Sequence, residues 1–184
     1  MTRLPESTAR RYGQVFDEIA AEYDRRRPAY PDQLVDQACR VAGIGSGDHV
    51  LELGCGSGQL TRGLAARGLH VMALEPGPSL IALAGQNLEG TAELEFVNAQ
   101  FEGALLPREQ FQAVFSASAF HWVDPKVSWQ KSADVLVCHH PDCVENRLLR
   151  PDPMDRATFA FQQMFDQSHN ASFAPQCGLS TTAF

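Results

Sequence analysis

Two kinds of hydrophobic spacing alternate along the middle of the chain. Short runs of apolar and β-branched residues predict buried strands, and the stretches between them, with apolar residues at every third or fourth position, predict helices. We therefore expect an α/β fold, in which a Rossmann-like and mostly parallel sheet is flanked by helices. The expected strands are residues 50–53, 70–75, 90–99, 112–116 and 135–137.

Helical spacing is also present before the first strand. Residues 7–23 predict one helix and residues 32–41 a second, and Pro28 and Pro31 make residues 24–31 an extended connector between them. The expected apolar face of the first helix is formed by Tyr12, Val15, Phe16, Ile19, Ala20 and Tyr23. Later helices are expected over residues 58–68, 78–90, 124–133 and 152–168.

The stretch VLELGCGSG, residues 50–58, joins the first expected strand to a helix. Glycine occupies every second position from Gly54 to Gly58, and Glu52 precedes the first glycine by two residues. Because glycine lacks a Cβ, a ligand can lie against the main chain, and the first N–H groups of the next helix point into the same space. The pattern predicts a ligand-binding turn. It does not match G-x-G-x-x-G, the fingerprint of dinucleotide-binding turns.

A second acidic residue lies 21 positions after Gly54. Glu75 ends the second expected strand and is followed by Pro76. In Rossmann-like sheets a carboxylate about 20 residues beyond the first glycine accepts hydrogen bonds from ribose hydroxyls, and one carboxylate can accept from both hydroxyls of a diol. S-adenosylmethionine and NAD both carry this diol, so Glu75 indicates a nucleoside pocket without choosing the ligand.

Three segments resemble one enzyme family. The glycine stretch is similar to the first motif of class I S-adenosylmethionine-dependent methyltransferases. ASAFHWVDP, residues 117–125, and FDEIAAEYDRRRPAYP, residues 16–31, are similar to a small-molecule subgroup of that family, types 11 and 25. The resemblance implies S-adenosylmethionine as the cofactor. It implies a cofactor site formed by Glu52, Gly54, Cys55, Gly56, Gly58, Glu75, Pro76, Gln100, Phe101, Ser116, Tyr23 and Arg27, with Tyr30 near the cofactor or substrate.

Some of these assignments have structural alternatives. In the family, Gln100 and Phe101 would lie beside the adenine, but they also suit an ordinary passage from strand to loop. His121 is the candidate catalytic base, because an imidazole near the methyl donor could take a proton from a hydroxyl or amine nucleophile. It equally suits a core histidine held by backbone between Phe120 and Trp122.

The function that the resemblance implies is methyl transfer from S-adenosylmethionine to a small-molecule acceptor. One alternative is a non-catalytic domain that binds S-adenosylmethionine but lacks part of the substrate pocket. A nicotinamide-dependent oxidoreductase is a further alternative, which the missing dinucleotide fingerprint disfavours.

Composition narrows the classes of partner. The chain has 184 residues, enough for one domain with a core, and a formal net charge of −7. The only cluster of basic residues is 25–27, so no nucleic-acid partner is expected. No membrane span and no apolar leader is evident, so we expect a cytoplasmic protein. Cys138, His139, His140 and Cys143 do not have paired-ligand spacing, so no metal site is expected.

The C-terminal part departs from the family pattern. Residues 139–184 contain one valine and no isoleucine, so the final hairpin of the family's sheet is expected to be missing. We expect an N-terminal helical arm over residues 1–45, a cofactor-binding core over 46–150, and a helix with a flexible tail over 151–184. A shortened sheet would leave an apolar edge that a second copy could cover, which makes a homodimer possible.

Overall fold

The computed structural model describes residues 16–137. Residues 16–18 are helical and lead into α2. The elements that follow are α2 (Ala20–Arg26), α3 (Asp32–Ala42), β1 (His49–Leu53), α4 (Gln59–Ala65), β2 (His70–Leu74), α5 (Pro78–Asn87), β3 (Leu94–Val97), β4 (Ala113–Phe115), the 3₁₀ turn η1 (Phe120–Trp122) and α6 (Pro125–Val135).

The four strands form one parallel sheet in the order β3-β2-β1-β4. The chain lays β2 and β3 on one side of β1 and then crosses to place β4 on its other side. The order therefore reverses between β1 and β4, and ligands of open α/β sheets bind beyond the carboxyl ends of the strands at such a switch point. The predicted Rossmann-like fold is confirmed, and this edge of the sheet is where the site must be sought.

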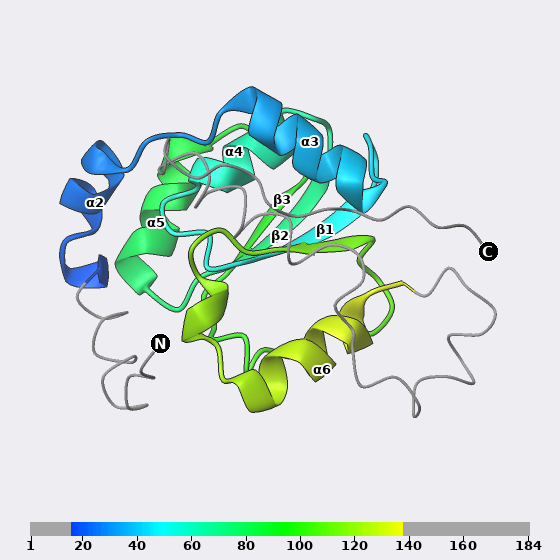
Figure 1. The fold of residues 1–184 in the computed structure, drawn as a ribbon. Helices are drawn as coiled ribbons and strands as arrows, with labels where there is room; N and C mark the ends of the chain where they lie inside the picture. The colour runs from blue at the N-terminus through cyan, green and yellow to red at the C-terminus, as the bar shows by residue number, and fades with distance from the viewer. Residues whose placement is uncertain (1–15, 138–184) are drawn as a thin grey trace, which may run out of the picture.

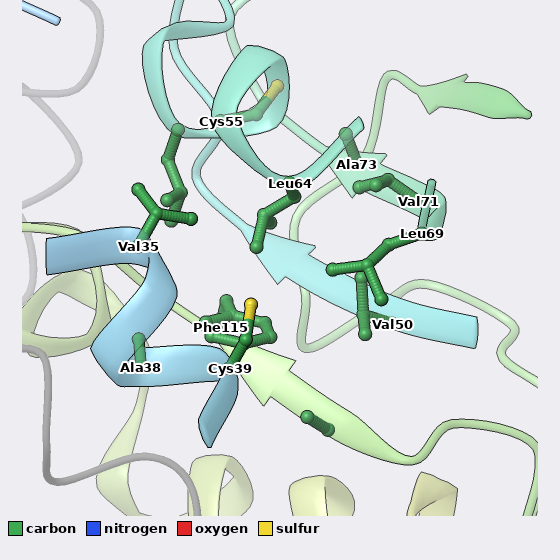
Figure 2. Packing of buried hydrophobic residues seen from close by; sticks show 12 residues of the cluster. Val35, Ala38, Cys39, Val50, Cys55, Leu64, Leu69, Val71, Ala73 and Phe115 are labelled. Atoms are coloured by element: carbon green, nitrogen blue, oxygen red, sulfur yellow. The ribbon is translucent and has the colours of Figure 1, made fainter. Parts of the chain in front are cut away.

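Successive strand residues serve two hydrophobic clusters, one on each face of the sheet. Val50 packs against α3 and α4, whereas its neighbour Leu51 faces the side of α6. The two helices α3 and α4 lie on one face and α6 on the other (Figure 1). Figure 2 shows the first cluster, in which Cys39 of α3 lies close to Phe115 of β4. Because both faces are covered, most residues of β1 and β2 and all three of β4 are apolar.

The helix of the N-terminal arm differs from its prediction. It continues to Arg26, where residues 24–26 were expected to be extended, and only Arg27 leaves the helix. Glu22 pairs with both Arg25 and Arg26 one turn later, which favours the extra residues. The expected apolar face is also wrong in part, because Phe16 is 36% and Ile19 47% exposed.

The expected strands 70–75, 90–99 and 112–116 are longer than the observed β2, β3 and β4, and the expected strand 135–137 is not formed. β3 covers residues 94–97 because a turn that places Glu93 at φ 62° precedes it. β4 covers residues 113–115. In place of a strand over 135–137, Val135 ends α6 and Leu136 forms a single parallel bridge with Phe111. The bridge lies beside β4, on the side where a fifth strand would continue the sheet.

Several predictions concern residues outside the described range. They are the start of the first helix, the helix over 152–168, the tail, the missing final hairpin, and the rejected metal site at Cys138, His139, His140 and Cys143. These remain predictions. Within residues 16–137 no helix is long and apolar enough to cross a membrane.

Candidate functional site

The glycine turn lies at the carboxyl end of β1, between β1 and α4. Gly54, Gly56 and Gly58 have φ angles of +70°, +58° and +93°, a region that L-residues rarely adopt. A Cβ on Gly54 would lie 2.3 Å from the Cβ of Ala119, so the turn fits closely under the loop that follows β4. The backbone N–H groups of Gly54 and Cys55 both donate to the Leu74 carbonyl, which fixes the turn against β2.

Glu75 links this turn to the one that follows β2. Its Oε2 accepts from the Gly56 N–H at 3.0 Å and its Oε1 from the Gly77 N–H at 2.9 Å. Burial raises the pKa of Glu75, and the two N–H donors partly offset this. A carboxylate has about four acceptor positions, so two remain for other donors. The structure thus places Glu75 against the glycine turn, as its spacing from Gly54 predicted.

Glu52 is the second buried carboxylate of the site. It points from β1 toward α4, where its Oε2 accepts from the Thr61 hydroxyl at 2.8 Å. Burial, with a smaller contribution from the nearby Glu75, raises the pKa of Glu52 to about 7, although the Thr61 hydroxyl opposes the shift. Burial also raises the pKa of the adjacent Cys55 thiol, which therefore stays protonated and is no nucleophile at neutral pH.

The arm lies over the glycine turn. The Tyr23 ring approaches to 3.5 Å from the position of a Cβ on Gly56. Burial raises the pKa of Tyr23, so its hydroxyl remains a donor. With the arm in this position the cavity between the arm and the turn is about 10 Å³, roughly the space of one water molecule. The cavity is lined by Tyr23, Arg27, Tyr30, Glu52, Gly54, Cys55, Gln59, Leu60 and Ala117.

Arg27 brings a positive charge to this cavity. Its guanidinium lies 5.6 Å from the centre of the Tyr23 ring, and one of its nitrogens donates to the Tyr30 hydroxyl at 3.4 Å. Within residues 16–137 no carboxylate forms an ion pair with Arg27. A half-buried cation whose contacts within that range are with two tyrosines is suited to an anionic group of a ligand.

The remaining predicted cofactor residues lie around the same edge of the sheet. Ser116 donates its hydroxyl to the Leu53 carbonyl at 3.1 Å and so joins the ends of β4 and β1. Pro76 is exposed, and its carbonyl accepts from the Asn98 amide at 3.1 Å. Gln100 is exposed, whereas Phe101 is 5% exposed in the core beneath α6. The roles of Gln100 and Phe101 at the adenine therefore remain predictions.

His121 lies in η1 and does not line the cavity. The residue is exposed, and its ring is tilted against Trp122 with 4.6 Å between the ring centres. Burial of part of the ring lowers the pKa of His121, so the imidazole is mostly neutral at pH 7 and can accept a proton. Its role as a base remains a prediction.

Sequence reasoning missed the polar residues that hold the arm in place. Asp17 accepts hydrogen bonds from residues at the start of α5, and Asp24 accepts from Gln59 and Asn87. Their partners are 35 to 63 residues away in the chain. The pattern around them shows only ordinary polar positions of an amphipathic helix. Within the described range no cluster of three potential ligands could hold a metal ion.

Comparison with known proteins identifies this architecture. A family model described as a methyltransferase domain matches residues 50–138. An uncharacterised methyltransferase of Mycobacterium tuberculosis is 35% identical over 121 residues, 66% of this chain and 47% of the relative. Both matches are to methyltransferases, and they support the class I S-adenosylmethionine-dependent family that the glycine turn predicted.

Other methyltransferases show how far the likeness extends. An uncharacterised methyltransferase of Bacillus subtilis is 29% identical over 172 residues, which are 92% of this chain and 75% of that protein. Among solved structures, a Haemonchus contortus N-methyltransferase was determined in complex with phosphomonomethylethanolamine and S-adenosylhomocysteine. Its fold matches this chain with a TM-score of 0.60 at 19% identity, and the matched part is 73% of this chain and 34% of the Haemonchus chain. The chain spans about half the length of the Mycobacterium relative.

Proposed function

We propose that the chain binds S-adenosylmethionine at the glycine turn and transfers its methyl group to a small-molecule acceptor. The observation that carries this proposal is the junction of the glycine turn with Glu75, at the point where the strand order reverses. Three glycines leave the main chain there without Cβ atoms, and the carboxylate of Glu75 keeps acceptor positions for a ribose diol.

The charges around the turn fit the two ends of this cofactor. Glu75 suits the ribose hydroxyls. Arg27, which no carboxylate of residues 16–137 neutralises, suits the carboxylate of the methionine part. The Tyr23 hydroxyl lies beside the same turn as a further donor. Because the cavity beneath the arm is about 10 Å³, we infer that Tyr23 moves when the cofactor enters.

The chemistry needs alignment more than acid or base groups. S-adenosylmethionine supplies, when bound, a methyl group already activated on a positively charged sulfur. The protein then has to hold the acceptor in line with that group and keep water out. The arm covers the turn with Tyr23 and Tyr30, and the loop after β4 closes the other side through Ala117. His121 is available as a proton acceptor if the acceptor atom must lose a proton.

Calorimetry with separate ligands tests the proposal. We expect S-adenosylmethionine and S-adenosylhomocysteine to bind and NAD to show no heat. Binding of NAD alone, or of none of the three, would contradict it. Methyl transfer is then measured with a panel of small phenols, carboxylic acids and amines, and with RNA as the control. Turnover of RNA in preference to every small molecule would contradict the small-molecule part of the proposal.

A further inference from the structure

The arm carries two carboxylates that contact the two turns of the site. We propose that Asp17 and Asp24 are positioning residues, each of which holds one of the turns that the cofactor would contact. The inference rests on the proposed function, because it concerns the site assigned there to S-adenosylmethionine. In Figure 1 the helix α2 lies beside α5, and the two helices pack against each other.

Asp17 holds the turn that follows β2. Its Oδ1 accepts from the backbone N–H groups of Ser79 and Leu80 at 2.7 and 3.0 Å, and its Oδ2 accepts from the Ser79 hydroxyl at 3.1 Å. The N-cap residue of α5, Gly77, has no side chain to bond these groups. A carboxylate 62 residues earlier in the chain therefore caps the helix. Gly77 is also the residue whose N–H donates to Glu75.

Asp24 holds the glycine turn. Its Oδ1 accepts from the side-chain amides of Gln59 at 3.2 Å and Asn87 at 3.0 Å. The same Gln59 amide donates to the Ser57 hydroxyl at 2.7 Å, and the same Asn87 amide donates to the Ser57 carbonyl at 3.1 Å. Ser57 lies between the second and third glycines, so two amides oriented by Asp24 fix both its side chain and its main chain.

The two turns are themselves connected. The Gly56 N–H donates to Glu75, whose other oxygen accepts from Gly77, so a shift of either turn moves the carboxylate assigned to the ribose. Binding sites lose affinity when their groups move by more than about 0.5 Å from the productive position. The arm therefore acts as part of the frame of the cofactor site, in addition to covering it with Tyr23.

The test compares Asp17→Ala and Asp24→Ala with the full-length wild type. Amide hydrogen exchange without cofactor reports the turns, and calorimetry with S-adenosylhomocysteine reports affinity. Each variant should speed exchange in its own turn, residues 77–80 for Asp17 and 56–59 for Asp24. Each should also weaken binding by up to about tenfold, because that factor corresponds to the net contribution of about one hydrogen bond.

Three further variants separate positioning from general stability. Asp17→Asn and Asp24→Asn keep an acceptor oxygen and should restore most of the affinity. Asp36→Ala removes an exposed carboxylate of α3 that pairs with Arg67 and bonds to neither turn, and should change neither measurement. If Asp24→Ala does not fold, Asn87→Ala removes the bond between Asp24 and Asn87 together with the bond to the Ser57 carbonyl. Because both changes remove the Asp24–Asn87 bond, their combined loss of affinity should be smaller than the sum of the two single losses.

The outcomes distinguish this proposal from the function on which it rests. Wild-type affinity in both alanine variants, with faster local exchange, would overturn the positioning role and leave the proposed function intact. Absence of S-adenosylhomocysteine binding by the wild type would overturn the proposed function. Exchange that rises equally over residues 16–137 in either variant would overturn the local role of that carboxylate, whatever the wild type binds.

Discussion

Buried carboxylates determine much of the chemistry of the site at the level of single residues. Glu52 of β1 is 1% exposed, and Glu75, directly after the adjacent strand β2, is 7% exposed. Water can solvate neither fully, so each depends on the donors that the fold supplies. Glu75 has two backbone N–H donors, whereas the one side-chain donor to Glu52 is the Thr61 hydroxyl. This difference makes Glu52 the carboxylate that favours its protonated form.

The stability of the protein should therefore depend on the ionisation of Glu52. Its pKa rises from 4.5 to about 7 on folding, so the folded state binds more protons than the unfolded state between these values, and stability falls as pH rises through them. Glu52→Gln removes the titrating group and keeps an acceptor for Thr61. The free energy of unfolding of the variant should exceed that of the wild type by under about 1 kcal/mol at pH 5 and by about 3 kcal/mol at pH 8.

Urea unfolding of both proteins from pH 5 to pH 8 measures this difference. Other titrating groups act equally in the two proteins, apart from the coupling of Glu52 with Glu75, so subtraction removes most of their effect. A difference between variant and wild type that stays constant over this range would show that Glu52 is ionised in the folded protein at all these pH values.

Arg27 should distinguish the two ends of the proposed cofactor. Removing a charged partner of a hydrogen bond costs about 1.5–3 kcal/mol, which corresponds to a loss of roughly tenfold to 100-fold in affinity. Arg27→Ala should lower the affinity for S-adenosylhomocysteine by this factor and leave the affinity for adenosine unchanged, because adenosine has no carboxylate. Competition calorimetry measures both. An equal loss for the two ligands would place Arg27 at the nucleoside instead.

The predictability of site residues from sequence follows from how local their interactions are. Glu75 could be assigned because its distance from Gly54 is set by one helix and one strand. Asp17 could not, because its partners at Ser79 and Leu80 become neighbours only when the arm docks. Phe101 follows a strand end in sequence, yet its ring packs in the core, where Lys131 lies 5.2 Å from its centre.

At the level of elements, local end signals fix some boundaries and tertiary contacts fix others. Asp124 and Pro125 place the start of α6, as the sequence predicted, and Pro78 does so for α5. The start of the arm helix α2 is not marked by a capping side chain. Its apolar residues Phe16 and Ile19 remain partly exposed because the arm docks through polar bonds. Hydrophobic spacing therefore predicted the existence of this helix but not its buried face.

The cap of α6 provides a test at this scale. The Asp124 side chain accepts from the Lys126 N–H at 2.9 Å. Asp124→Ala should destabilise the protein by about 1 kcal/mol, and Asp124→Asn by only a few tenths, because asparagine is as good a cap. In thermal unfolding the Tm of the alanine variant should be about 2–4 °C below that of the wild type, and the Tm of the asparagine variant should change little. Equal decreases in both variants would mean that the charge of Asp124, and not its cap, stabilises α6.

At the level of the whole molecule, the parallel sheet was the most predictable feature and its closing edge the least. Alternating strands and helices with short connections leave few arrangements other than a parallel sheet. In such a sheet the helices cover both faces, and the two hydrophobic clusters around Val50 and Leu51 lie one on each face. The strand predicted over residues 135–137 was wrong, because Val135 belongs to α6 and Leu136 forms only an isolated bridge with Phe111.

Ligand binding should stabilise the whole fold, because the site joins both halves of the sheet. At a free concentration of 100 times Kd, a ligand that binds only the folded state adds about 2.7 kcal/mol. For a protein of this size, S-adenosylhomocysteine at that concentration should raise the Tm by about 5–10 °C. NAD at an equal concentration should leave the Tm unchanged.

Glu75→Ala should reduce the increase in Tm at a fixed ligand concentration, because the ribose loses its acceptor. A full increase in that variant would place the ribose away from Glu75, and an increase with NAD would contradict the choice of cofactor.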